Sequence, residues 1–322
     1  MWKEITTALC MGCTVAAAAA ADGYPAKPIK LIVPYMAGSP ADSLARIVAD
    51  GMSKDLKSPV VVDNRPGASG MIGMSVVSKA APDGYTLALG SMDTQAINPW
   101  VYKKVPYQPI NDFAPVAMLG SFNMVLVSGK DALQRSGKDV IDQARKHPEK
   151  VSYGTWGVGS LAHLWGMRLE KAAGVQLFHV PFQGSPAAMQ SMLAGQVDMI
   201  FMLPNVAQAM QKDGKVQILG STSSERLPQY PQVPTLAEQG FTGFSGVEWF
   251  AIYAPAKTPA PIVQVLNQSA NKVLSSPAVV QRIEGLSMKA EGGTAESLRA
   301  TQLKDSSGWK ELIQKSQFQL LE

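Results

Sequence analysis

The stretch IKLIVPYMAGSPAD, residues 29–42, decides the fold. Its apolar run predicts a strand, its small residues predict a loop, and the apolar side chains between Leu44 and Met52 recur at helical spacing. Ser39 can cap that helix, and Pro40 stands where a first-turn proline belongs. A second strand, glycine loop and helix follow before Gly90, and both loops lack lysine and histidine. Such loops suit the binding of an anion.

Strand-like and helical patterns continue to alternate along the chain. Apolar runs predict strands at residues 29–33, 60–62, 86–89, 124–127, 151–153, 197–201, 216–220 and 249–254. Most are separated by helical patterns, so we expect an α/β fold with mainly parallel sheets covered on both faces. After Tyr253 the chain becomes helical, beginning at Thr258 and Pro259, and such a tail packs onto a sheet already formed.

The first residues differ in composition from the rest. Lys3 is the only early base, residues 5–21 are nearly uncharged, and small residues suited to cleavage precede Asp22. Residues 1–21 are therefore predicted to be a signal peptide, with the periplasm as destination. A retained membrane helix is the alternative, but this apolar core is short and rich in alanine. Both cysteines, Cys10 and Cys13, lie in this leader, so the mature chain would have no disulfide or thiolate metal site.

Composition argues against several classes of function. The formal charge is +4, from 29 basic and 25 acidic residues, and no basic cluster suggests nucleic acid or a membrane surface. No later segment approaches eighteen consecutive apolar residues. The three histidines, His147, His163 and His179, show no metal-ligand spacing. We expect no metal and no cofactor.

Several motifs in order carry a resemblance to a known family. They are residues 34–38 with 42–46, then 63–70, 81–86, 96–99, 157–164, 180–187 and 195–198. Together they resemble the Bug family of extracytoplasmic solute receptors, the substrate-binding proteins of tripartite tricarboxylate transporters. The resemblance covers nearly the whole mature chain.

The resemblance implies a two-lobed periplasmic binding protein fold of type II-like organisation, with a ligand cleft between the lobes. Residues 22–124 and 248–322 would form lobe 1, and residues 125–247 would form lobe 2. Gly240, Gly243 and Gly246 fit a hinge at the return crossing, although glycines of a plain loop are the alternative. The implied partners are a small carboxylate and a membrane permease, and a monomer is expected.

The ligand is expected beyond the carboxyl ends of the strands, where loops lead into helix N-termini. These loops contain no lysine or arginine, so backbone amides and hydroxyls are predicted to hold the carboxylate. Each Ser or Thr could instead cap its own helix, and Asp42 is assigned to the helix dipole. The predicted ligand-binding residues are Tyr35, Gly38, Ser39, Ala41, Ser91, Thr94, Thr155, Trp156, Ser160, Gln183, Gly184, Phe201, Met202 and Trp249.

The rest of the ligand would meet aromatic and apolar residues. Relatives often carry an acid where Met202 stands, which makes an amino-acid ligand unfavourable, and Asp93 and Gln95 also depart from the family pattern. We therefore expect an aromatic mono- or dicarboxylate stacked on Trp156 or Trp249. An aliphatic di- or tricarboxylate is the alternative, as is packing of these rings within their own lobes.

An exported α/β enzyme is the rival from another class. Residues 157–162 imitate a dinucleotide-binding turn, but about twenty residues further on no acid is present to bind a ribose. No Gly-x-Ser-x-Gly elbow occurs, and Ser160 with His163 lacks an orienting acid. We expect a receptor and not an enzyme. A purely structural protein would not respond to a carboxylate in thermal melting.

Overall fold

The computed structural model describes residues 23–132, 135–228, 230–241, 244, 246–316 and 318–322. The predicted signal peptide, residues 1–21, lies outside this part, as does Gly243 of the predicted hinge. The described chain forms two compact units. The first contains residues up to Ser121, Trp249–Glu311 and Glu322, and the second contains Phe122–Glu248 and Leu312–Leu321.

The first unit is built on a six-stranded sheet in the order β11-β4-β10-β3-β1-β2. Strand β1 pairs in parallel with both β2 and β3, whereas β10 pairs with β3, and β11 with β4, in antiparallel fashion. The strands are β1 (Ile29–Val33), β2 (Val60–Asn64), β3 (Thr86–Ser91), β4 (Phe113–Phe122), β10 (Glu248–Pro255) and β11 (Lys289–Gly292).

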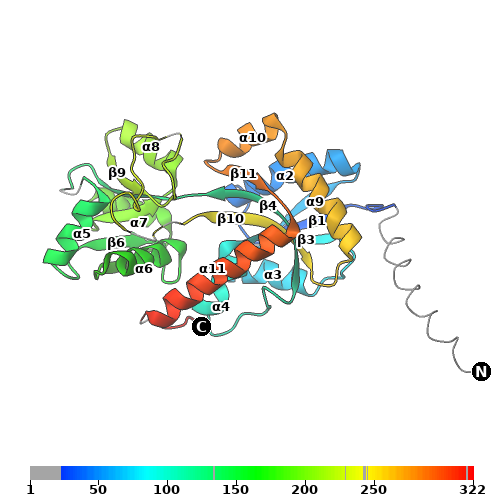
Figure 1. The fold of residues 1–322 in the computed structure, drawn as a ribbon, viewed down its shortest axis with the longest axis horizontal. Coiled ribbons are helices and arrows are strands. Elements are labelled where there is room, and N and C mark those ends of the chain that lie inside the picture. The colour runs from blue at the N-terminus through cyan, green and yellow to red at the C-terminus, as the bar shows by residue number, and fades with distance from the viewer. Residues whose placement is uncertain (1–22, 133–134, 229, 242–243, 245, 317) are drawn as a thin grey trace, which may run out of the picture. The chain divides into compact units, whose positions relative to one another are not determined.

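Helices cover both faces of this sheet. Helix α2 packs against α9 and α10, and Figure 1 shows these three together, with α3 on the opposite face. The helices are α2 (Pro40–Leu56), α3 (Met71–Ser78), α4 (Asn98–Val101), α9 (Ala260–Leu274), α10 (Pro277–Glu284) and α11 (Ala295–Lys315), with a 3-10 turn η1 (Ala68–Gly70) and a π-helical turn η2 (Asp93–Ile97).

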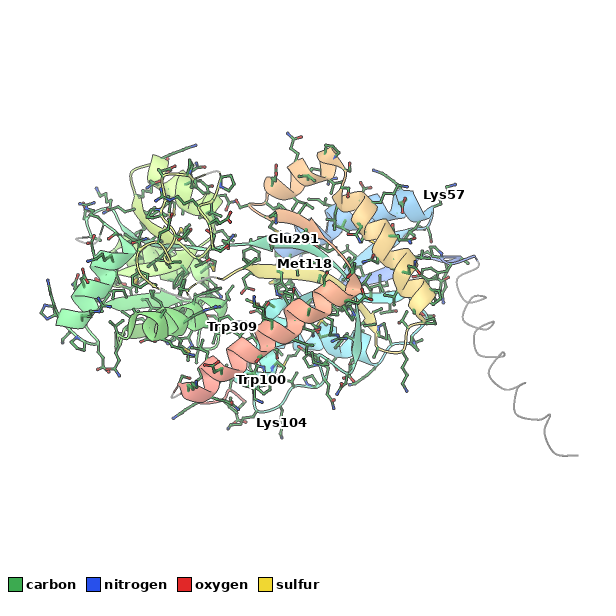
Figure 2. The ribbon with its side chains drawn as sticks, in the orientation of Figure 1. Lys57, Trp100, Lys104, Met118, Glu291 and Trp309 are labelled. Atoms are coloured by element: carbon green, nitrogen blue, oxygen red, sulfur yellow. The ribbon has the colours of Figure 1, made fainter. Side chains whose placement is uncertain are left out.

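Helix α11 is attached to the first unit through polar contacts of two tryptophans, both labelled in Figure 2. The indole N–H of Trp100 donates to Ser306 Oγ at 2.9 Å. The indole N–H of Trp309 donates to the sulfur of Met92 at 3.4 Å. Trp309 is buried, so the helix contributes to the core next to the turn that follows β3.

The second unit has a five-stranded sheet in the order β7-β6-β8-β5-β9. Strand β6 pairs in parallel with β7 and β8, whereas β5 pairs in antiparallel fashion with β8 and β9. The elements are β5 (Val125–Gly129), α5 (Gly137–Lys146), β6 (Ser152–Thr155), α6 (Leu161–Ala173), β7 (Phe178–Pro181), α7 (Ser185–Leu193), β8 (Met199–Met202), α8 (Pro204–Lys212) and β9 (Val216–Ser221).

Alternating side chains of this sheet enter two separate cores. Phe201 belongs to the core under α5 and α6, whereas its neighbours Ile200 and Met202 belong to the core under α7 and α8. Successive side chains of a strand point to opposite faces, so both faces must be apolar. The helices of Figure 1 lie on both sides of the second sheet accordingly.

The α/β fold class is confirmed, but both sheets are mixed rather than mainly parallel. The parallel pairs come from strand–helix–strand units, whereas β5 and β10, each the first strand of the part of the chain that follows a change of unit, pair antiparallel. Three strands were not predicted from the sequence: the ten-residue β4 and the four-residue β7 and β11. Among the described helices, none combines the length and apolar character needed to cross a bilayer.

Candidate functional site

The loop between β1 and α2 is organised around a buried carboxylate. Asp42, which is 3% exposed, accepts hydrogen bonds from the Gly38 N–H at 2.9 Å, Arg46 Nε at 3.0 Å and Asn64 Nδ2 at 2.9 Å. Burial acts to raise its pKa, but the hydrogen bonds from Arg46, Gly38 and Asn64 together hold the pKa of Asp42 below its usual value. Asp42 thus fixes the loop, in agreement with its predicted structural role.

Most amide donors at the start of α2 already have partners. Ser39 is the cap, and its Oγ accepts from the Asp42 N–H at 3.2 Å, while Ser43 N–H donates to the Ser39 carbonyl. Pro40 has no N–H. The Gly38 N–H is bound to Asp42, so of the three predicted backbone donors Ala41 offers an N–H without a partner within the described residues.

The loops after β1 and β3 meet because these strands are parallel neighbours. The Tyr35 hydroxyl donates to Ser91 Oγ at 2.6 Å. Ser91 and Thr94 are both buried and hydrogen-bond one another: the Ser91 N–H donates to Thr94 Oγ1 at 2.9 Å, and the Thr94 N–H donates to Ser91 Oγ at 3.2 Å. Tyr35, Ser91 and Thr94 therefore form one polar cluster in the first unit.

The π-helical turn after this cluster contains both residues that depart from the family pattern. Burial raises the pKa of Asp93 to about 6. Gln95 is buried, and its side-chain oxygen and carbonyl accept from Gln302 Nε2 on α11 at 3.0 and 3.2 Å. This turn is consequently hydrogen-bonded to α11 through Gln302.

The second unit brings the loops after β6 and β7 to one edge of its sheet. Thr155 ends β6 with no exposed surface, and the Phe182 N–H donates to its carbonyl at 2.9 Å. Trp156 packs partly on the core, whereas Gln183 is exposed and Gly184 has φ +92° at the start of α7. The predicted residues of these two loops therefore lie at one edge.

Ser160 caps α6, and the first turn of that helix again presents amide donors. Its Oγ accepts from the His163 N–H at 3.4 Å, and the Leu164 N–H donates to its carbonyl at 3.0 Å. The N–H groups of Leu161 and Ala162 have no partner in the described part of the chain. A helix start carries partial positive charge, and amide donors of the predicted kind are present at the starts of α2 and α6.

Two histidines that look scattered in the sequence come together beside Thr155. The imidazole rings of His163 and His179 stack with centroids 3.8 Å apart and planes 10° apart. His179 Nε2 lies 2.7 Å from Thr155 Oγ1, and the Gly159 N–H donates to His163 Nδ1 at 3.1 Å. Burial lowers the pKa of His163 to about 3 and that of His179 to about 4. No local sequence signal indicated this pair, because β6–β7 pairing brings it together.

Three predicted apolar contact residues are buried within their own units. Phe201 is 1%, Met202 7% and Trp249 2% exposed. The indole N–H of Trp249 donates to Asp305 on α11 at 2.8 Å. Stacking by Phe201 or Trp249 would require these side chains to leave a core. In residues 23–322, apart from the gaps given above, no group of three or more histidine, aspartate or glutamate side chains could hold a metal ion.

The chain is similar to known receptors over nearly its whole length. Residues 44–318 match the model of the tripartite tricarboxylate transporter family receptor. A UPF0065 protein from the tcbD-tcbE intergenic region of Pseudomonas sp. strain P51 is 37% identical over 91% of this chain and 87% of its own length. BugT of Bordetella pertussis is 36% identical over 83% of this chain and 82% of its own length.

Solved structures give the same result. A Rhodopseudomonas palustris protein with adipate has a TM-score of 0.79 at 29% identity, covering 90% of this chain and 97% of its own. MatC of the same organism, with bound malate, has a TM-score of 0.76 at 29% identity over 90% of this chain and 100% of its own. Sequence motifs, fold and these matches together show that the chain belongs to the Bug-type family of tripartite tricarboxylate transporter receptors.

Proposed function

We propose that this protein is a periplasmic receptor that captures a small carboxylate and delivers it to a membrane permease. It acts by reversible binding without catalysis, and we propose that it is a monomer. Of the residues given by the sequence, we propose Ala41 and Thr155 as the principal donors of the two units, and we leave out the buried Phe201, Met202 and Trp249.

The observation that carries this proposal is the Ala41 N–H at the start of α2. The residue is 3% exposed, and its amide is one of the first-turn N–H groups that lack an intrahelical acceptor and need a partner outside the helix. The partial positive charge of the seventeen-residue helix lies at the same point. A carboxylate oxygen, directly or through water, would satisfy both requirements.

For the body of the ligand we put an aliphatic dicarboxylate ahead of an aromatic acid. Burial of Phe201 and Trp249 leaves the partly buried Trp156 and Phe182 as the rings available for stacking. Two similar solved proteins hold adipate and malate. The aromatic acid favoured by the sequence remains the second candidate, supported by those two rings.

Isothermal titration with adipate, malate, phthalate, benzoate and glutamate tests this proposal. We expect saturable binding of at least one aliphatic dicarboxylate and weaker binding of the aromatic acids. The Thr155→Val variant should lower affinity about tenfold, since a hydrogen bond to a charged group is lost. Thr258→Val is the matched control, because the buried Thr258 hydroxyl has no hydrogen-bond partner in the described chain.

The outcomes separate the possible ligand classes. Tight binding of phthalate or benzoate alone would reverse our order of the two carboxylate classes. Binding of none of these carboxylates would contradict the receptor assignment for this class of solute.

A further inference from the structure

The strongest unassigned feature of the second unit is the stacked histidine pair beside Thr155. We propose that His179 is a positioning residue for carboxylate binding: it donates from Nε2 to Thr155 Oγ1, so that the Thr155 hydroxyl gives its own proton to the ligand. This inference rests on the proposed function, since Thr155 is one of its donors. His163 supports the arrangement by holding the His179 ring and the far end of the same loop.

The hydrogen-bond geometry at Thr155 makes His179 its main side-chain partner, and the tautomer of that ring sets which of the two atoms donates. The Thr155 Oγ1 to His179 Nε2 distance is 2.7 Å, whereas the contacts of Oγ1 with the Gly157 N–H and carbonyl are both 3.3 Å. A contact of 3.3 Å is long for a hydroxyl donor. The imidazole is therefore the strong partner of this hydroxyl. Because Thr155 has no exposed surface, its hydroxyl reaches a ligand only when the 3.3 Å contact with Gly157 opens.

The tautomer of His179 decides what Thr155 can do. With hydrogen on Nε2, the ring donates and the threonine proton remains available to a carboxylate oxygen. With Nε2 bare, Thr155 must donate to the ring and would present a lone pair to the carboxylate, which is repulsive. Only the Nε2–H tautomer is compatible with Thr155 as a carboxylate donor.

His163 holds the other end of the loop in the same tautomer. The Gly159 N–H donates to His163 Nδ1 at 3.1 Å, which makes Nδ1 an acceptor and places the hydrogen of the neutral ring on Nε2. Tyr153 packs against both imidazoles, with centroid distances of 6.5 Å to His163 and 5.1 Å to His179. The pair thus joins the first and last residues of the segment Thr155–Gly159.

A double-mutant cycle tests this role with adipate and malate as probes. His179→Phe keeps an aromatic ring for stacking but removes the donor, and we expect it to weaken binding about tenfold. In the Thr155→Val background the same change should have almost no further effect, because both variants remove one hydrogen bond. The control is His147→Phe, which changes an exposed histidine at the end of α5 and should bind like wild type.

Long-range ¹H–¹⁵N NMR of the imidazoles provides a readout that does not need a ligand. We expect His163 and His179 to show the neutral Nε2–H pattern at pH 7. An Nδ1–H pattern for His179 would overturn the proposal. Normal affinity in His179→Phe, or additive losses in the double variant, would also overturn the proposal. If wild type still binds a carboxylate in that case, the receptor assignment stands. If wild type binds neither probe nor any other carboxylate tested, the receptor assignment fails, and the positioning role fails with it.

Discussion

Gly246 is required by packing rather than by backbone freedom. A Cβ at this position would fall inside the Trp165 ring, which is buried in the core of the second unit. The Gly246 N–H also donates to the Thr222 carbonyl at 2.8 Å. We expect Gly246→Ala to lower the free energy of unfolding by about 2–3 kcal/mol, because either the ring or the backbone must move. Urea denaturation followed by circular dichroism would measure this loss.

Gly308 provides the matched control. It lies within α11, and a Cβ there would meet no atom within 4 Å. Gly308→Ala should therefore be neutral or raise stability by up to about 1 kcal/mol, through helix propensity alone. Equal destabilisation by both substitutions would contradict the packing role of Gly246. The predicted hinge at this position would then regain support.

Asp93 should make stability depend on pH. Its pKa is about 6 in the folded chain against 3.8 in the reference state. Since the folded carboxyl holds its proton more tightly, stability is full below pH 3.8 and is lost as pH rises through 6. Asp93→Asn should therefore raise the free energy of unfolding by about 2 kcal/mol at pH 8 and change it little at pH 3.5. This figure is smaller than the full pKa difference would give, because Asp93 is partly exposed to solvent. Denaturation midpoints at the two pH values test this. A gain that is equal at both would exclude titration of Asp93 as its cause.

The histidine pair of α6 and β7 should make stability respond to pH in the opposite direction. His163 and His179 have pKa values of about 3 and 4 in the folded unit, below their unfolded value of 6.5. The unfolded chain therefore gains protons first as pH falls, so stability is full above pH 6.5 and decreases toward pH 4. In His179→Gln, the loss of unfolding free energy between pH 7 and pH 4 should be smaller by about 1–2 kcal/mol. Thermal melting between pH 7 and pH 4 measures the slope. An unchanged slope in the variant would show that His179 does not carry the effect.

Elements with strong local patterns could be predicted, and those defined by distant partners could not. The run at β1 and the cap at Ser39 lie within one segment, so the sequence contains both. Strand β4 carries Pro115, and β11 is a short edge strand, and neither has a sustained apolar period. Their positions depend on pairing with other strands, which a local pattern does not encode.

The candidate site divides in the same way. The capping roles of Ser39 and Ser160 follow from residues three positions apart, and the structure has both. The His163–His179 stack depends on the pairing of Tyr153 with His179 across β6 and β7. Burial of Phe201 follows from strand alternation, but an aromatic residue near a strand end fits a core and a ligand contact equally well. Only the packing in the folded structure distinguishes a core role from a ligand contact.

The molecule as a whole carries little net charge, and its predicted carboxylate-binding residues include no cationic side chain. The formal charge is +4. Binding through amide and hydroxyl donors at helix starts depends on short, partly buried contacts, which salt screens weakly. We therefore expect the Kd for a dicarboxylate to change less than about threefold between about 0.05 M and 0.5 M NaCl. Calorimetric titration with adipate, with ionic strength as the only variable, gives this dependence directly.

The same titration distinguishes carboxylate binding by amide and hydroxyl donors from binding by a cationic side chain. A pair formed with an exposed Lys or Arg would lose affinity steeply over this salt range, because the interaction is screened within about 8–10 Å. Thr155→Val should weaken adipate binding by the same factor at every salt concentration, since a hydroxyl contributes no net charge. A loss of affinity above about tenfold for wild type at high salt would mean that a cationic side chain holds the carboxylate. Arg46, which lies 3.0 Å from Asp42 beside the first loop, would then be the first residue to replace.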